Sequence, residues 1–416
     1  MTRVSIKTVG CRLNQAETGR IVAEFLQAGY RLVDWGQPCD VAVVHSCAIT
    51  GEAARTYARH ARVARRRAPG ALIVMAGCAA AVDPDRLKKM AEADLVFSQK
   101  EKFGMPARIG SGRGDASDPA PPERGGLLPR FSATRALVKV QDGCNFHCAY
   151  CIVPQARGRP VSRRLDSIAD EVRRLTEAGY REMALTGANI GLYCHGRTRL
   201  PELLARIESI AGVARMRISS IEISTTEKAV IDFMAQSDKL CRSLHFPVQS
   251  GDDRILEAMG RRYRVRDYRE RVEYALDRLG RPGLGTDIVV GFPGEDARAF
   301  ANTLALVNDL PFSNLHVFPF SPRPGTRACA MRPVVADGEK KERVARLLAL
   351  GEQKKEDFAR QWLGREVRAL IEKNDGRLAR GWTGEYMPAA VVDPGAHANE
   401  IRAFVAHAVR DGVLHG

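Results

Sequence analysis

The chain has 416 residues, enough for two or three domains, and its apolar content is ordinary for a globular protein. Its net charge of +15 favours a polyanionic partner, most simply nucleic acid, although an arginine-rich proteome would give the same excess. The first residues lack the apolar run of a signal peptide, and no stretch approaches the length of a membrane span, so we expect a cytoplasmic protein with reduced cysteines and no membrane partner.

Residues 1–107 alternate strand-like and helix-like segments, a pattern typical of a doubly wound parallel α/β domain. We expect strands at Val4–Val9, Val41–Val44, Leu72–Ala76 and Asp94–Phe97. Asn14 is predicted to cap a helix that runs to about Ala28, and a basic helix is predicted from about Glu52. Arginines of that second helix recur at helical spacing and would form one positively charged stripe: Arg55, Arg59, Arg62 and Arg66.

Three cysteines of this segment, Cys11, Cys47 and Cys78, each lie just past the carboxyl end of a predicted strand. Ligands bind at that edge of an open α/β sheet, so the three thiols could converge on one site. The alternative is three unrelated buried cysteines, which are common in globular proteins. Each cysteine sits in a polar or small-residue loop, where packing roles are less frequent, and the spacing alone leaves both interpretations open.

Residues 108–132 are rich in glycine, proline and charge and are predicted to form a linker. A second alternating series in residues 133–365 predicts a partial (β/α)6 barrel, followed by a helix at about Gly338–Gln361. Its six strands are expected at Ala136–Gln141, Glu182–Thr186, Arg215–Ser220, Ser243–Val248, Leu284–Val290 and Asn314–Phe320. Residues 366–416 are predicted to form a small antiparallel β module from strands at Val367–Glu372, Met387–Val392 and Ile401–Val409.

Cys144, Cys148 and Cys151 form a C-x3-C-x2-C motif directly after the first strand of the predicted barrel. Three thiolates on one tight loop can hold three irons of a [4Fe–4S] cluster and leave the fourth iron open to a small molecule. A zinc site with His147 as a ligand is the alternative, but zinc sites usually pair two C-x2-C units, and no matching pair lies nearby. The motif therefore favours an iron–sulfur cluster that carries chemistry at its open iron.

The loop CNFHCAYC resembles the signature of the radical S-adenosylmethionine (SAM) enzymes. The surrounding segments resemble the methylthiotransferases among them: KTVGCRLNQAE, SCAIT, GCAA, CIVPQARGRPVSR, TGANIGLY, RISSIE, LHFPVQSGDDRILEAM, DIVVGFPGE and HVFPFSPRPGT. The C-terminal module occupies the place of the family's RNA-binding TRAM domain, although it carries few of the expected basic and aromatic residues. The resemblance implies that SAM binds the open iron and that Tyr150 lies close to its adenine.

The resemblance also implies a second [4Fe–4S] cluster, held by Cys11, Cys47 and Cys78, that carries the sulfur. The segments GCRLNQAE and CRSLHFPVQSG are most like the branch that methylthiolates C2 of N6-threonylcarbamoyladenosine at position 37, next to the anticodon of tRNA. The alternatives are the isopentenyladenosine branch, the branch that modifies a ribosomal protein aspartate, and a non-catalytic cluster-containing RNA-binding protein. The expected partners are the tRNA anticodon loop and an electron donor such as flavodoxin or ferredoxin, without DNA.

Polar residues at the predicted strand ends of the barrel are candidates for holding the methionine and ribose parts of SAM. They are Gly187, Asn189, Ser219, Ser220, Glu222, Gln249 and Asp287. Each of them could instead be a turn or capping residue. Four arginines that follow the cysteine motif are candidates for phosphate contacts with tRNA, unless they form a solvated surface: Arg157, Arg159, Arg163 and Arg164.

Overall fold

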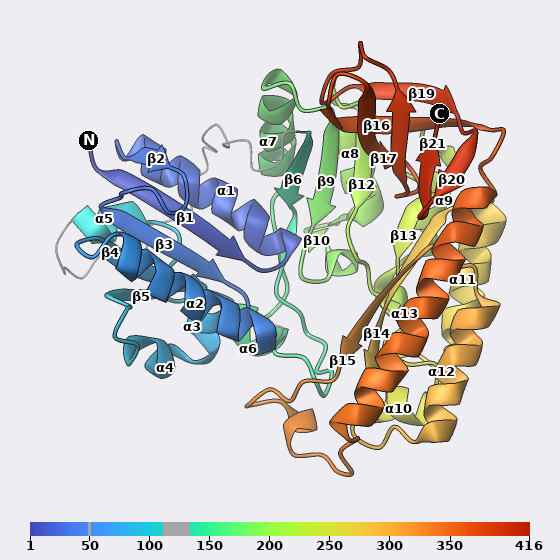
Figure 1. Cartoon of the computed structure of the whole chain (residues 1–416), viewed down its shortest axis with the longest axis horizontal. Helices are drawn as coiled ribbons and strands as arrows, with labels where there is room; N and C mark the ends of the chain where they lie inside the picture. Colours follow the sequence, from blue (N-terminus) through green and yellow to red (C-terminus); the bar gives the residue numbers. More distant parts are fainter. Residues whose placement is uncertain (49–50, 111–133) are drawn as a thin grey trace.

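A computed structural model describes residues 1–48, 51–110 and 134–416, with the side chains of residues 51–55 excepted. Most of the predicted linker therefore lies outside the described residues, as does the side chain of Arg55. Figure 1 shows an N-terminal sheet flanked by helices, a larger strand-and-helix part beside it, and a C-terminal sheet at one end of that larger part. This arrangement confirms the predicted α/β fold class. No helix in the described part of the chain is long and apolar enough to cross a membrane.

The N-terminal part is a parallel five-stranded sheet in the order β2-β1-β3-β4-β5, which confirms the predicted doubly wound architecture. Its strands are β1 (Arg3–Val9), β2 (Arg31–Val33), β3 (Val41–Ser46), β4 (Leu72–Gly77) and β5 (Leu95–Phe97). Its helices are α1 (Arg12–Gln27), α2 (Gly51–Arg67), α3 (Cys78–Val82), α4 (Pro84–Lys88) and α5 (Met105–Gly110). Successive residues of a strand face opposite sides, so Val44 packs with α2 and α3 while Val43 packs with α1 and α5.

One local expectation for this part of the chain is wrong, and one strand was missed. Cys11, not Asn14, occupies the N-cap position of α1. Asn14 is buried in the first turn, where its Oδ1 accepts a hydrogen bond from the Cys11 thiol at 3.1 Å and its Nδ2 donates to the Ser46 carbonyl at 3.2 Å. The edge strand β2 was not expected, because three residues are too few to show a periodic pattern.

The second part contains the six expected barrel strands, all in parallel pairings. They are β6 (Arg135–Lys139), β9 (Glu182–Thr186), β12 (Arg215–Ile218), β13 (Ser243–His245), β14 (Gly283–Val290) and β15 (Asn314–Pro319). They form two three-stranded sheets, β12-β9-β6 and β13-β14-β15, joined by one parallel bridge between Met216 and Leu240. The long helices between the strands are α7 (Leu165–Glu177), α8 (Leu200–Glu208), α9 (Lys228–Gln236), α11 (Val265–Leu279) and α12 (Ala297–Asp309). The open barrel is thus confirmed.

Shorter elements lie between the strands and helices of the barrel. They are β7 (Gln141–Asp142), α6 (Val153–Arg157), β8 (Val161–Ser162), η1 (Ile190–Leu192), β10 (Cys194–His195), β11 (Thr198–Arg199), η2 (Ile223–Thr225), α10 (Asp253–Ala258) and η3 (Arg327–Cys329). Two expected strands end early, because β12 stops at Ile218 and β13 stops at His245. After β13 comes Pro247, which has no amide hydrogen to donate to a ladder. The chain then bends at Gln249, whose φ of 70° is in the left-handed region.

The C-terminal strands follow helix α13 (Asp337–Arg360) and form a six-stranded sheet in the order β19-β16-β17-β18-β21-β20. They are β16 (Glu366–Asn374), β17 (Leu378–Thr383), β18 (Pro388–Val392), β19 (Ile401–Val405), β20 (Ala408–Arg410) and β21 (Val413–His415). The sheet is antiparallel as predicted, except that β18 and β21 pair in parallel. The sequence did not indicate β17 and β21, and the single strand expected at Ile401–Val409 is two strands.

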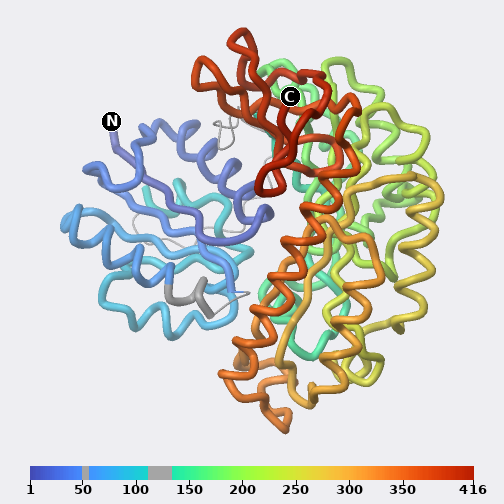
Figure 2. Tube along the Cα trace, turned by 45° about the vertical axis from the view of Figure 1, so that its right-hand side comes forward, coloured from blue at the N-terminus to red at the C-terminus, as the bar shows by residue number. Residues whose placement is uncertain are grey.

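Figure 2 shows the C-terminal sheet against one end of the barrel. Buried arginines of β12 make the contact. Arg217 donates to the carbonyls of Thr383 and Gly384 at 2.9 and 3.1 Å, and Arg215 donates to the carbonyl of Trp382 at 3.1 Å. Both guanidinium groups also pair with the buried Glu182. The turn between β17 and β18 is therefore fixed at the wall of the barrel.

Candidate functional site

The cysteine loop (residues 144–151) is held in place by backbone hydrogen bonds to distant parts of the barrel. The amide of Cys144 donates to Gly158 at 3.1 Å, and the amide of Ala149 donates to Met259 at 2.7 Å. Ala149 also accepts a hydrogen bond from Ala328 at 2.8 Å. The segments around Met259 and Ala328 thus fix the loop, and the three thiols lie on one short, anchored turn.

Burial raises the pKa of the Cys144 thiol and raises that of Cys151 to about 12. Such thiols ionise only when a cation or metal ion stabilises the thiolate. Arg261 lies beside the loop and donates to the Cys148 sulfur at 3.4 Å, and the amide of Phe146 donates to the Cys144 sulfur at 3.4 Å. These donors suit sulfur ligands that carry negative charge, so the loop fits an iron–sulfur cluster.

Arg261 also holds two of the predicted SAM contacts. Its guanidinium group pairs with Glu222 and donates to the Tyr150 hydroxyl at 3.3 Å. The second carboxylate oxygen of Glu222 is buried and has no hydrogen-bond partner within the described part of the chain. A buried acceptor left in this state is costly unless a ligand donates to it, and an ammonium group would fit it.

A cavity of about 1080 Å³ lies between the barrel strands and the N-terminal part. Among the predicted site residues, it is lined by Cys11, Tyr150, Arg157, Gly187, Ser219, Ser220, Gln249 and Asp287. Asn189 and Glu222 do not line it. Asn189 is instead buried between the Gln141 and Thr225 side chains, with hydrogen bonds of 2.9 and 3.1 Å. The strand-end candidates therefore converge on one space, except for these two residues, which are not part of its lining.

Two histidines that the sequence reasoning missed also line the cavity. His245 and His316 each share a hydrogen bond with Asp287 Oδ1, at 2.9 and 3.1 Å, and their ring centroids are 5.0 Å apart. Burial alone would raise the pKa of Asp287, but the two histidines outweigh it and lower that pKa far below its usual range. Both histidines lie on strands adjacent to β14, and only the strand pairing reveals that they meet.

The second set of cysteines, Cys11, Cys47 and Cys78, meets at the carboxyl edge of the N-terminal sheet. Register explains why, because Val9 of β1 pairs with Ser46 of β3, and Ser46 pairs with Gly77 of β4. The thiols of Cys11 and Cys47 lie within hydrogen-bond reach, which is the main reason that the pKa of Cys11 is lowered to about 6. The register therefore places the three cysteines at the ends of three adjacent strands.

Two glycines make this approach possible. Gly10 has a φ of 149°, and a Cβ there would lie 2.6 Å from the Cys47 Cβ. Gly77 has a φ of 103°, and a Cβ there would lie 2.5 Å from the Ser46 carbonyl oxygen. A side chain at either position would push the strand ends apart, so the glycine before Cys11 and the one before Cys78 are required by packing.

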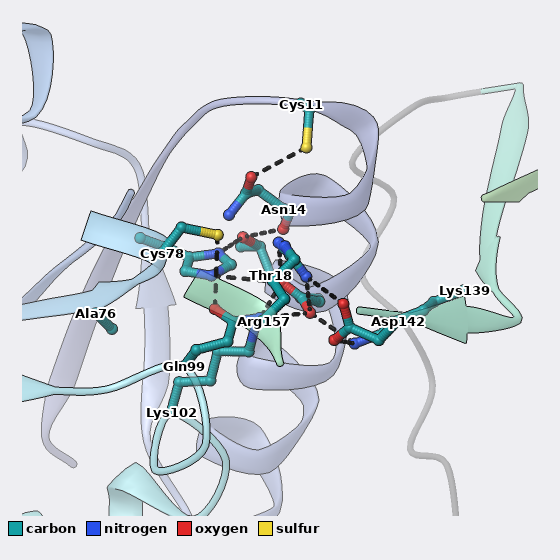
Figure 3. Close-up of polar contacts among 12 residues, drawn as sticks. Cys11, Asn14, Thr18, Ala76, Cys78, Gln99, Lys102, Lys139, Asp142 and Arg157 are labelled. Atoms are coloured by element: carbon teal, nitrogen blue, oxygen red, sulfur yellow. Dashed lines mark hydrogen bonds and ion pairs between the residues drawn. The ribbon is translucent and has the colours of Figure 1, made fainter. Parts of the chain in front are cut away.

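A buried ion-pair network lies beneath the second set of cysteines (Figure 3). Its centre is Glu17, whose carboxylate is within 2.5 Å of Lys102, 2.7 Å of Lys139 and 3.0 Å of Arg157. Asp142 pairs with Lys139 and Arg157 at 2.6 and 2.9 Å. Three cations face two carboxylates, and the excess positive charge favours anionic sulfur ligands nearby.

Further contacts tie this network to the cysteines. Gln99 accepts a hydrogen bond from the Cys78 thiol at 3.8 Å and donates to Glu17 at 3.1 Å. Burial lowers the pKa of the neighbouring His45 to about 3, so its imidazole is neutral and adds no charge. Lys139 and Arg157 belong to the barrel, whereas Glu17 and Lys102 belong to the N-terminal part. The network therefore joins the two cysteine-bearing parts of the chain.

The placement of Arg157 corrects the prediction that it binds phosphate. Its side chain is 3% exposed and pairs with Glu17 and Asp142, so it is committed to the ion-pair network. Arg163 pairs with Glu171 at 2.5 Å and donates to the Lys139 carbonyl at 2.7 Å. Arg159 and Arg164 are exposed, and neither forms an ion pair within the described residues. They remain the two arginines of this group that are open to an anionic ligand.

Comparison with known proteins places these features in a family. The family described as "Radical SAM superfamily" matches residues 138–307, and "Uncharacterized protein family UPF0004" matches residues 3–98. A relative from Aquifex aeolicus, named threonylcarbamoyladenosine tRNA methylthiotransferase MtaB, is 33% identical over 91% of this chain and 95% of its own. A relative of the same name from Bacillus subtilis is 34% identical over 93% of this chain and 90% of its own.

Other relatives differ in name or share only the fold. A Thermus thermophilus protein named tRNA-2-methylthio-N(6)-dimethylallyladenosine synthase is 33% identical over 97% of this chain and 90% of its own. The solved structure of the radical S-adenosylmethionine methyltransferase TsrM from Kitasatospora setae has a TM-score of 0.61 at 16% identity. It covers 79% of this chain and 75% of that chain, and the likeness concerns the fold alone.

Proposed function

Because this chain belongs to the radical SAM methylthiotransferase family, we propose that it methylthiolates C2 of N6-threonylcarbamoyladenosine at position 37 of tRNA. The observation that supports this proposal is the shared cavity, onto which Cys11 of the second cysteine set and the SAM-facing residues of the barrel both open. A reaction that joins a sulfur group to a radical-activated carbon needs both centres at one space. The names of the MtaB relatives favour the threonylcarbamoyl substrate.

Radical SAM enzymes use one [4Fe–4S] cluster and SAM, and here Cys144, Cys148 and Cys151 are the proposed ligands of that cluster. Cys11, Cys47 and Cys78 are the proposed ligands of a second [4Fe–4S] cluster. When bound, the first cluster and SAM supply a 5′-deoxyadenosyl radical, and the second cluster carries the sulfur. Radical chemistry is needed because the C2 hydrogen of adenine is not acidic and the carbon is a poor electrophile.

The chain's own residues bind and orient the reactants around the cavity. Outside the cavity lining, Arg261 fixes Glu222 beside the cysteine loop, and we propose the unpartnered carboxylate oxygen of Glu222 as the acceptor for the ammonium group of SAM. Tyr150 packs edge-on against Phe292 at 6.4 Å between ring centroids, which gives the adenine of SAM a fixed aromatic neighbour. The residues of the cavity lining that we propose to hold SAM are Gly187, Ser219, Ser220, Gln249 and Asp287, and Asn189, which is held by Gln141, is a further proposed contact outside that lining.

The substrate side of the proposal rests on charge and on single-stranded RNA. The anticodon loop is single-stranded, so its bases can be turned out and reach a cavity. Arg159 and Arg164 are exposed near the cysteine loop and would contact phosphates without reading sequence. An electron donor such as flavodoxin or ferredoxin would reduce the first cluster, and the reaction would take place in the cytoplasm.

The proposed division of labour follows the predicted segments. Residues 1–107 would carry the sulfur-bearing cluster, residues 133–365 would generate the radical, and residues 366–416 would close the substrate cavity from the side of Tyr386. This division assigns a catalytic centre to each of the first two segments and none to the third.

Methylthiolation of isopentenyladenosine is the second candidate, because relatives named for the dimethylallyl substrate are as similar as those named MtaB. Mass spectrometry of nucleosides from bulk tRNA, in cells with and without this gene, separates the two. We expect loss of 2-methylthio-N6-threonylcarbamoyladenosine and accumulation of its precursor. Loss of the isopentenyl counterpart would reject the proposed substrate, and no change in either nucleoside would redirect the search to a ribosomal protein aspartate or to a non-catalytic RNA-binding role.

A further inference from the structure

Arg12 is the residue directly after Cys11, and its half-buried side chain lines the cavity. Within the described part of the chain, no carboxylate pairs with it. Three other cations on the cavity wall are paired, Arg157 with Glu17, Arg217 with Glu182 and Lys340 with Asp337, whereas Lys341 shares the unpaired state of Arg12. An arginine that keeps its charge uncompensated on the wall of an active-site cavity is ready for an anionic ligand.

The side chain of Arg12 is positioned by Tyr386 from the turn between β17 and β18. The Arg12 guanidinium group donates to the Tyr386 hydroxyl, and its central carbon lies 5.4 Å from the ring centroid. A hydroxyl group is a neutral partner, so it fixes the direction of the guanidinium group without neutralising its charge. The planar fork of an arginine retains further N–H donors for a carboxylate.

Tyr386 itself is held in an unusual conformation. Its φ of 66° lies in the left-handed region, which is strained for a residue with a bulky side chain. The ring stacks on Trp382 at 4.8 Å between centroids, and the Arg217 guanidinium carbon lies 4.9 Å from it. The same Arg217 holds the Thr383 carbonyl. The barrel thus stabilises a strained turn whose tyrosine reaches the N-terminal part of the chain.

The chemistry of the substrate matches this arrangement. In N6-threonylcarbamoyladenosine, C2 and C6, the carbon that bears N6, are both bonded to ring atom N1, so the substituent begins two ring bonds from the reacting carbon. That substituent ends in a carboxylate. If C2 is presented to the cavity beside Cys11, the long side chain of the next residue starts close enough to reach for that carboxylate, because neighbouring Cα atoms are about 3.8 Å apart.

We propose that Arg12 binds the carboxylate of the threonylcarbamoyl group and that Tyr386 is the positioning residue for Arg12. The inference rests on the proposed function and deepens it, since it assigns the choice between the two substrate branches to one side chain. Paired N–H donors of an arginine match the two oxygens of a carboxylate. An isopentenyl group would instead press hydrocarbon against an unpaired charge, which a binding site strongly disfavours.

Binding without turnover tests the proposal. Fluorescence anisotropy would give the Kd of the cluster-loaded protein, with SAM and without reductant, for two anticodon stem-loop RNAs. One carries N6-threonylcarbamoyladenosine at position 37, and the other carries the methyl ester of the same carboxylate. We expect wild type to bind the acid at least about tenfold more tightly, as one charge-assisted hydrogen-bonded pair allows. We expect Arg12→Gln to remove that preference while its Kd for the ester stays within about twofold of wild type.

Two further variants sharpen the experiment. Lys341→Gln removes another cavity-lining cation that pairs with no carboxylate in the described residues, and it should keep the preference for the acid. Tyr386→Phe removes the positioning hydroxyl and should reduce the preference to a few-fold. Retention of the full preference by Arg12→Gln, or its loss in Lys341→Gln, would overturn the assignment. Iron content and the unchanged affinity for the ester show that each variant is folded.

If the proposed function itself were wrong, a different measurement would show it. Mass spectrometry of RNA after reaction with wild type would then show methylthiolation of isopentenyladenosine and none of the threonylcarbamoyl substrate. If wild type converts the threonylcarbamoyl substrate and Arg12→Gln still prefers the acid, only the role of Arg12 is rejected.

Discussion

Glu17→Gln tests whether the buried ion-pair network joins the two cysteine-bearing parts of the chain. The substitution keeps the shape of the side chain and removes the negative charge that Lys102, Lys139 and Arg157 share at 2.5, 2.7 and 3.0 Å. Glu17 and Lys102 are fully buried, so the cations cannot recover the loss by hydration. Removal of one partner of a buried pair costs about 3–5 kcal/mol. Three cations would then face Asp142 alone.

Hydrogen exchange measured by mass spectrometry is the suitable assay, because it reports local opening and does not require two-state unfolding. A loss of about 3 kcal/mol raises exchange about 100-fold, since 1.36 kcal/mol corresponds to a factor of ten. We expect this increase in peptides from α1 and α6, which carry Glu17 and Arg157. Peptides from α11 lie elsewhere in the barrel and should keep their exchange rates.

Glu24→Gln is the matched control on the same helix. Glu24 pairs with the partly exposed Arg20 at 3.0 Å, and an ion pair of this kind contributes about 0–1 kcal/mol. Its exchange should therefore rise less than about tenfold. The double variant Glu17→Gln with Arg157→Gln should recover about 1–3 kcal/mol relative to the sum of the two single variants. Equal effects of Glu17→Gln and Glu24→Gln, or strict additivity in the double variant, would refute the network.

Four further outcomes follow from the site. Alanine at Cys144, Cys148 and Cys151 together should leave about half the iron and sulfide and abolish SAM cleavage, as elemental analysis and 5′-deoxyadenosine assays would show. Alanine at the second cysteine set should keep SAM cleavage and abolish methylthiolation, and a variant that still methylthiolates would reject the two-cluster proposal. Arg159→Gln and Arg164→Gln should each flatten the salt dependence of RNA binding by about 0.7 in the log–log slope, whereas Arg163→Gln, already ion-paired, should not. Because the pKa of Glu17 is lowered in the folded state, its stabilisation is present above about pH 4.3 and is lost as the pH falls toward the folded-state pKa. The difference in exchange between wild type and Glu17→Gln should therefore shrink only below about pH 4.3.

The sequence predicted the layered architecture well, because buried parallel strands are short apolar runs between clear breaks. It also predicted that Cys11, Cys47 and Cys78 directly follow the ends of strands, which β1, β3 and β4 confirm. It placed Asn14 at a helix cap because that residue type is a frequent cap. The buried position of Asn14 depends on the strand that approaches from Ser46, 32 residues away, and local sequence carries no information on that approach.

The partners of the charged side chains were the least predictable feature. Arg157 and Arg159 look alike in sequence, yet Arg157 is buried against Glu17, 140 residues away, and Arg159 is exposed. A cluster of arginines predicts a positive surface only if no carboxylate from another segment reaches it. The pairing of His245 and His316 with Asp287 was missed for the same reason, because the three residues lie on three different strands.

The active-site cavity needs all three parts of the chain, and this explains why the small C-terminal sheet lies where it does. The N-terminal part contributes Cys11 and Arg12, the barrel contributes the strand ends that we propose to bind SAM, and the C-terminal sheet contributes Tyr386. Arg217 of the barrel binds both Glu182 and the turn that carries Tyr386, so the position of that turn is set by the barrel itself. A module that only bound RNA would not need a strained tyrosine directed into the cavity. Its contact with Arg12 therefore argues that the C-terminal sheet shapes substrate selection beside the proposed sulfur-bearing site.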